Sequence, residues 1–122
     1  MATPRDIRRL AFQAIFQLDA SEQSDPSIAP MDAEDPAGIR AWLAAYADEN
    51  ASKLRPAEIE KALSLAQDAF ADRRAADDAI RRHAPTWPAV RQPAVDRAIL
   101  RLAHYEITQL NLDPRIAINE AV

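Results

Sequence analysis

The chain has 122 residues, 27 of them alanine, with one glycine, no cysteine and a net charge of −4. So few glycines exclude phosphate-cradling glycine loops and dinucleotide fingerprints, and the absence of cysteine excludes disulfides, thiolate-bound metals and cysteine nucleophiles. This length and composition predict a single all-α domain over residues 1–122, with no cofactor, no metal and no enzymatic chemistry.

The N-terminal residues carry the start signals of a helix. Thr3 is suited to cap it, Pro4 to occupy its first position and Asp6 to complement the helix dipole in the first turn. Apolar residues at helical spacing then predict a helix that ends near 19–20 and is buried on two sides. Because charge returns early and no apolar run reaches membrane-spanning length, we expect a cytoplasmic protein without a signal peptide or a membrane segment.

An acidic segment follows. Residues 21–60 hold nine acidic and three basic side chains. Three prolines, with serine and acidic residues, predict a loop over 21–37, and apolar spacing predicts a short helix at about 38–48. The segment 21–54 gives no other indication of its role and is treated as a tolerated loop insertion.

Proline also marks the start of the next helix. Pro56 predicts a helix whose pattern either continues or bends near 73–74 and ends in a basic turn at 81–83. Two prolines three positions apart then enforce a turn over 84–88.

The strongest helical pattern comes after Pro93. Apolar residues around most of the circumference predict a helix over about 94–110 at the centre of the fold. Asp113 and Pro114 then provide a cap and a first helical residue for a final short helix.

The acidic total hides a basic stretch. Residues 73–101 contain seven arginines and three aspartates, and 13 of the 15 basic residues in the chain are arginine. Guanidinium groups suit bidentate phosphate contacts and stack on bases, so RNA binding is one interpretation. The other is a set of solvated helix faces, since GC-rich genomes favour arginine and alanine over lysine.

The two histidines give no sign of a catalytic or metal site. His83 and His104 lie on different predicted helices, and neither has an acidic neighbour at metal-ligand spacing. We expect both to be surface or hydrogen-bonded polar residues.

Four segments resemble the NusB family, and together they span about 1–20 and 57–122. The two most specific are Val-Asp-Arg-Ala-Ile-Leu-Arg-Leu-Ala-His-Tyr-Glu-Ile at 95–107 and Ile-Ala-Ile-Asn-Glu-Ala-Val at 116–122. The other two are Trp-Pro at 87–88 and the arginine-led start at 8–16.

The resemblance implies a compact NusB-like bundle of two small helical subdomains and a role without catalysis. NusB proteins are bacterial transcription antitermination factors that bind the boxA element of nascent ribosomal RNA together with NusE, a small-subunit ribosomal protein. The resemblance therefore implies transcription regulation of ribosomal RNA synthesis as the function. It implies single-stranded boxA-type RNA, NusE and the RNA polymerase antitermination complex as partners, and no membrane.

The family extends beyond Val122. The resemblance therefore implies a chain that lacks the rest of its last helix and one further C-terminal helix, with apolar faces of the central helix exposed. We expect a partner or a second copy, as in a homodimer, to cover that surface.

Candidate site residues follow from the resemblance together with charge. Arginines at the start of the first helix are the best candidates for phosphate and base contacts, because a helix N-terminus also favours anions. The residues expected to bind RNA are Arg5, Arg8, Arg9, Gln13, Arg73 and Arg74. Those expected to bind the protein partner are Phe16, Tyr105, Glu106, Asn119 and Glu120.

Internal roles are alternatives for some of these residues. Phe16 suits core packing as well as partner contact, and Tyr105 suits a buried ring with a bonded hydroxyl. Arg97 and Arg101 share a helix face, with Asp96 and Glu106 as their nearest local acids. We expect Arg97 to pair internally with an acidic residue rather than with RNA.

Two further functions fit the same residues. The thin arginine start and the net acidity favour a NusB-like protein-interaction module or dimer without RNA binding. The family's domain also occurs at the front of a ribosomal RNA cytosine methyltransferase, so the chain could be the RNA-binding module of such an enzyme.

Overall fold

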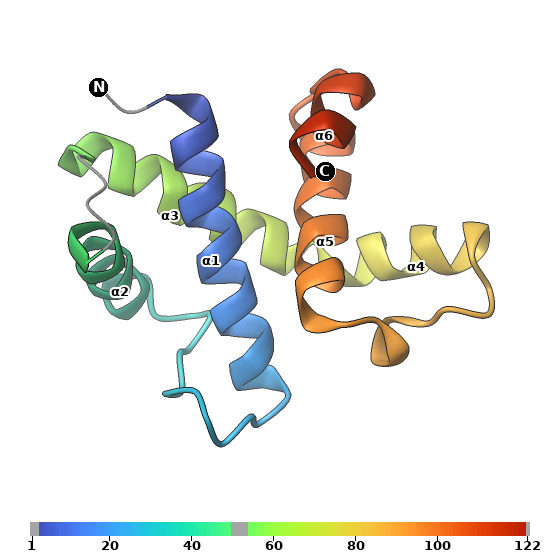
Figure 1. The fold of residues 1–122 in the computed structure, drawn as a ribbon, viewed down its shortest axis with the longest axis horizontal. Helices are drawn as coiled ribbons and strands as arrows, with labels where there is room; N and C mark the ends of the chain where they lie inside the picture. The colour runs from blue at the N-terminus through green and yellow to red at the C-terminus, as the bar shows by residue number, and fades with distance from the viewer. Residues whose placement is uncertain (1–2, 50–53, 122) are drawn as a thin grey trace. The chain divides into compact units, whose positions relative to one another are not determined.

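The computed structural model describes residues 3–49 and 54–121 and, at the C-terminal end, side chains as far as Asn119. The helices of these residues are shown in Figure 1, and no strand occurs among them, so the predicted all-α fold is confirmed. They are α1 (Pro4–Glu22), α2 (Pro36–Glu49), α3 (Pro56–Ala71), α4 (Arg73–His83), the short 3-10 helix η1 (Ala89–Arg91), α5 (Ala94–Gln109) and α6 (Pro114–Ala121).

Three features of the sequence analysis lie outside the described residues. They are the part of the acidic segment at 50–53, the side chain of Glu120 and the chain end at Val122.

Several helices begin where proline predicts a start. Among the described helices, α1, α2, α3 and α6 have proline as their first residue, where its fixed φ suits the helix and its missing N–H is not needed. At α1 the predicted cap is a full capping box. The Thr3 hydroxyl accepts from the Asp6 N–H at 3.3 Å, and the Thr3 N–H donates to the Asp6 carboxylate at 2.8 Å.

The chain divides into two compact units, which we describe separately. Unit 1 is Met1–Gln67 and unit 2 is Asp68–Val122, so most of α3 belongs to unit 1 and its last residues to unit 2. None of the described helices is long and apolar enough to cross a membrane.

Unit 1 has an aliphatic interior supplied by α1, α2 and α3. Every large member of this set is 7% exposed or less, and burial on this scale supplies the main stabilising free energy of a small unit. The residues are Leu10, Ile15, Leu18, Ile39, Leu43, Ile59 and Leu63.

Unit 2 buries small apolar side chains together with charged ones. Phe70 and Leu102 are its large buried apolar residues, and the others described are alanines. Arg97, Arg101 and Glu106 of α5 are each 6% exposed or less, whereas Val95 on the same helix is 47% exposed. The buried face of α5 therefore carries charged groups, which its apolar pattern did not indicate and which need internal partners.

The buried arginines of α5 have such partners. The Arg101 guanidinium donates to both carboxylate oxygens of Asp77 on α4, at 3.0 and 2.8 Å. Arg97 donates to the carbonyls of Ala89 and Gln92, at 2.9 and 3.2 Å. The internal role predicted for Arg97 is confirmed, although these two contacts are with carbonyls rather than with an acidic side chain. The acid that pairs with Arg101 lies 24 positions away rather than on its own helix.

The sequence left open whether the helix that starts at Pro56 continues or bends near 73–74. In the structure it breaks, because α3 ends and α4 begins around Asp72. Asp72 is the N-cap residue of α4 but makes no side-chain cap hydrogen bond. Its carboxylate lies 3.0 Å from Nδ1 of His104 instead. Asp68 lies one turn before Asp72, and its carboxylate accepts a hydrogen bond from the Tyr105 hydroxyl at 3.4 Å. The expectation that His104 is a hydrogen-bonded polar residue is confirmed.

Candidate nucleic-acid interface

One face of α1 combines positive charge with aromatic rings. Arg5, Arg9, Phe12 and Phe16 follow the spacing i, i+4, i+7 and i+11, which places them in one row along a helix. The two arginines are exposed and the two rings are half-buried, and Gln13, also half-buried, lies beside the row. We call these five residues the α1 stripe.

The stripe offers the two kinds of contact that single-stranded RNA requires. Guanidinium groups attract and hydrogen-bond phosphates, and partly exposed rings provide surfaces on which bases stack. Gln13 adds an amide that can both donate to and accept from a base edge. The arrangement can hold a flexible strand without any catalytic group.

The N-terminus of α1 contributes less to anion binding than its position indicates. The Asp6 carboxylate accepts the Thr3 N–H, and this hydrogen bond, with a second from the Thr3 hydroxyl, holds the pKa of Asp6 below its ordinary value of 3.8. Arg9 adds a smaller electrostatic effect in the same direction. Because a carboxylate already occupies the helix end, attraction for phosphate rests on the arginine side chains.

The other RNA candidates differ in how accessible they are. Arg8 is half-buried on the flank of α1 and takes part in interactions of its own. In unit 2, the Arg73 guanidinium lies 4.2 Å from the centre of the Phe70 ring and donates to the Phe70 carbonyl at 2.9 Å. Arg74, the next residue, is exposed.

The predicted partner-binding residues also occupy varied positions. Phe16 belongs to the α1 stripe and Asn119 is exposed on α6. Tyr105 is half-buried, and burial followed by the nearby Asp68 charge raises the pKa of its hydroxyl. Glu106 is only 4% exposed, so its position favours an internal role over direct contact with a partner.

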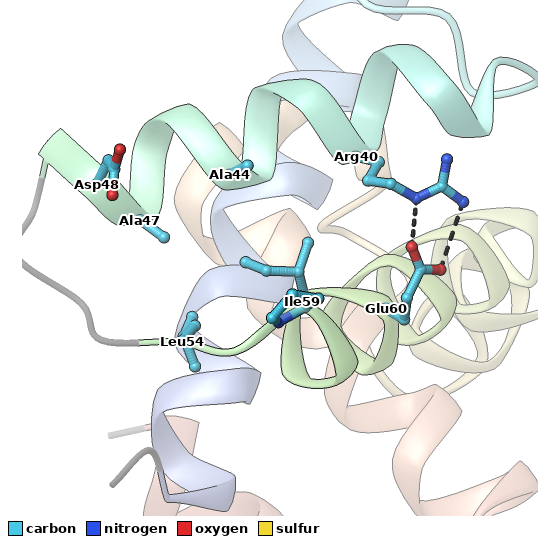
Figure 2. Close-up of a pocket in the computed structure, with 8 residues that line it drawn as sticks. Arg40, Ala44, Ala47, Asp48, Leu54, Ile59 and Glu60 are labelled. Carbon is cyan, nitrogen blue, oxygen red and sulfur yellow. Dashed lines mark hydrogen bonds and ion pairs between the residues drawn. The ribbon is translucent and has the colours of Figure 1, made fainter.

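A cleft of about 310 Å³ lies in unit 1 between α2 and the start of α3 (Figure 2). Its lining is largely apolar, and Arg40 and Glu60 at its edge point toward each other and form an ion pair. These two charged groups satisfy one another, and Asp48 is the other charged residue in the lining. No group of His, Asp and Glu among the described residues could hold a metal ion.

Phe12 is the residue of the stripe that sequence reasoning did not select. Its place in the apolar pattern of α1 made it a core candidate. The i+3 and i+7 spacing from the two exposed arginines was the available signal, and its half-buried ring in the structure makes that spacing meaningful.

Comparison with known proteins assigns the chain to a family. The model of the NusB family matches residues 5–122, which include the whole α1 stripe. The chain belongs to the NusB family. No solved structure matches it significantly.

Several curated NusB proteins cover this chain from end to end. The transcription antitermination protein NusB of Solibacter usitatus is 34% identical over 122 residues, which are 100% of this chain and 74% of the relative. The protein of the same name from Symbiobacterium thermophilum is 35% identical over 97% of this chain and 72% of its own length. That from Desulforapulum autotrophicum is 28% identical over 100% of this chain and 76% of the relative. These NusB relatives are transcription antitermination proteins.

Proposed function

We propose that this protein is a transcription antitermination factor that binds boxA-type RNA of nascent ribosomal RNA transcripts together with a NusE ribosomal protein. Membership of the NusB family and the α1 stripe support this function. In the proposal the protein acts in the cytoplasm as part of the RNA polymerase antitermination complex, and it binds rather than catalyses.

The α1 stripe is the observation that carries the proposal. Arg5 and Arg9 neutralise phosphates and release counterions, which makes binding depend on salt. Phe12 and Phe16 stack on bases, and Gln13 contributes a base-edge contact. Arg8, Arg73 and Arg74 are further candidates for phosphate contacts, to be ranked by substitution.

The protein partner acts through a shared surface in this proposal. Phe16 and Asn119 are accessible enough to touch a partner directly, and Tyr105 offers the edge of a ring. If NusE and RNA each strengthen the binding of the other, linkage requires the two coupling free energies to be equal. That equality can be measured from either side.

The test measures fluorescence anisotropy of a labelled boxA-type RNA at several salt concentrations. In the Arg5→Ala/Arg9→Ala variant, the loss of two phosphate contacts should lower the slope of log K against log salt by about 1.4, or about 0.7 per contact for single strands. The affinity should fall about tenfold or more at low salt, and NusE should restore part of it.

The matched control removes two exposed arginines elsewhere. Arg55→Ala/Arg115→Ala changes net charge equally but leaves the α1 stripe intact, because these side chains pair with Glu58 and Asp113. An equal loss in both variants would show a diffuse charge effect and remove the α1 stripe from the proposal. Binding to NusE without any RNA binding would favour a protein-interaction module.

A further inference from the structure

The structure separates the arginines of the basic stretch 73–101 into two groups. Three are committed to internal contacts: Arg97 and Arg101 are buried, and Arg73 lies against Phe70. The four that are exposed are Arg74, Arg81, Arg82 and Arg91. Three of these four lie on α4, so the positive charge available in this stretch is concentrated on one helix of unit 2.

The solvent face of α4 brings these three arginines together. Arg74 and Arg81 are seven positions apart and therefore share a face, with Arg82 on its flank. Arg81 pairs with Asp78 at 3.0 Å, with both side chains largely exposed. The side chains of Arg74 and Arg82 form no hydrogen bond or ion pair with another described residue. Arg74 and Arg82 are eight positions apart, or about 12 Å along the helix axis.

Helix stability does not explain the whole pattern. Arginines in the last turn complement the negative end of the helix dipole, which accounts for Arg81 and Arg82. Arg74 lies in the first turn, where a cation is unfavourable. Asp72 does not offset this by capping, because its carboxylate faces His104. The helix dipole therefore does not account for Arg74.

An aromatic ring follows the last turn of α4. The Trp87 N–H donates to the Ala84 carbonyl at 3.0 Å, which closes a turn directly after the helix. Gln92, 5% exposed, donates to the Trp87 carbonyl at 3.1 Å, and buried Arg97 holds the next turn through Ala89. Trp87 itself stays 36% exposed on this braced loop.

We propose that Arg74, Arg81, Arg82 and Trp87, the α4 surface, form a second RNA contact. The arginines bind phosphates and Trp87 stacks on a base. This inference rests on the proposed RNA-binding function and adds an RNA contact within unit 2. RNA fits better than an acidic protein segment, because forked guanidinium groups on α4 and an exposed indole in the turn that follows it match phosphates and bases together.

The experiment titrates the whole chain with a labelled single-stranded RNA of about 16 nucleotides, between about 50 and 200 mM salt. The Arg74→Ala/Arg82→Ala variant should bind about tenfold more weakly at the low end, with a salt slope lower by about 1.4. Trp87→Ala should weaken binding about tenfold without changing the salt slope, and Trp87→Phe should retain most of the affinity.

Two comparisons keep the outcomes distinct. Arg55→Ala/Arg115→Ala is the charge-matched control, and Arg5→Ala/Arg9→Ala reports on the α1 stripe. If only the α1 stripe variant loses affinity, the proposal that the α4 surface contacts RNA is wrong and the proposed function stands. If only the α4 variants lose affinity, RNA contact by the α4 surface is supported and RNA contact by the α1 stripe is wrong. If the unmodified chain binds no RNA, both fail.

Two further results would overturn the α4 surface. One is a control variant that loses as much affinity as Arg74→Ala/Arg82→Ala. The other is displacement of the labelled RNA by polyglutamate as effective as displacement by unlabelled RNA, which would indicate an acidic protein partner. Should Trp87→Ala unfold by circular dichroism, the double arginine variant, exposed at both positions, still decides the question.

Discussion

At the scale of residues, two neighbouring aspartates of α4 form ion pairs with arginines in different surroundings. Asp77 pairs with Arg101, whose side chain is 5% exposed, whereas Asp78 pairs with Arg81, which is 66% exposed. Removing one member of a buried pair leaves an uncompensated charge away from water. An exposed pair exchanges its contact for water and contributes little.

Arg101→Met should therefore lower the free energy of unfolding by about 2–4 kcal/mol, with the partial exposure of Asp77 keeping it from the upper end for a buried pair. Arg81→Met, the matched control, should cost less than about 1 kcal/mol. Urea unfolding of the two variants measures both values. Equal losses would mean that the Asp77 pair is no better shielded than its neighbour.

The sequence could not identify this pair, because nothing local connects Arg101 with Asp77 across 24 positions. Periodicity ranks positions by apolar character, so it predicted an apolar helix where α5 in fact buries Arg97, Arg101 and Glu106. Phe12 was missed for the related reason that an aromatic ring at helical spacing looks like a core residue. The site residues chosen by charge remain predictions, since exposure alone does not establish contact with RNA.

At the scale of elements, the helix starts were predictable because their signals are local. Proline at the first position and a carboxylate nearby mark α1 and α6 in the sequence and in the structure. Asp113 accepts the Arg115 N–H at 2.9 Å, as a cap residue does. The start of α4 differs, because Asp72 faces His104 across the unit. The sequence therefore did not decide whether the helix continues or bends at this point.

Three carboxylates at helix starts, those of Asp6, Glu58 and Asp113, have pKa values below their ordinary values. Backbone hydrogen bonds lower the pKa of Asp6 and Glu58, and the Arg115 side chain, followed by its backbone N–H, lowers that of Asp113. A carboxylate whose pKa is lower in the folded state stabilises the fold at pH values above its unfolded pKa. This stabilisation is lost as the pH falls through the folded-state pKa.

We therefore expect the unfolding temperature to be level near neutral pH and to fall progressively below about pH 5. Glu58→Gln should lower the unfolding temperature at pH 7 and reduce the loss on acidification, because the amide cannot titrate. Thermal melts followed by circular dichroism across this range measure both effects. A Glu58→Gln profile parallel to that of the unmodified chain would exclude Glu58 as a contributor.

At the scale of the whole molecule, net charge is a poor guide to function. The chain carries −4 overall, yet exposed arginines occur on α1 in unit 1 and on α4 in unit 2. Short-range contacts with phosphates depend on the local charge within about a Debye length, or about 8 Å at physiological ionic strength. An acidic protein can therefore bind RNA through local faces while its total charge limits non-specific attraction.

Binding of RNA should appear as added thermal stability. A boxA-type RNA at about 100 times its dissociation constant stabilises the folded state by about 2.7 kcal/mol, which for a chain of this size raises the unfolding midpoint by about 10 °C. Differential scanning fluorimetry with and without RNA measures the shift. It should shrink for Arg5→Ala/Arg9→Ala and with added salt, and an unchanged shift in that variant would contradict the α1 stripe.

The chain's one glycine, Gly38, lies in the first turn of α2. Its N–H donates to the Asp35 carboxylate at 3.1 Å, and a Cβ at this position would collide with that same carboxylate. Alanine gains about 1 kcal/mol over glycine inside a helix, but here the gain is offset by loss of a cap worth a similar amount. In a chain with 27 alanines, this is therefore a position where replacing glycine by alanine should leave the free energy of unfolding nearly unchanged.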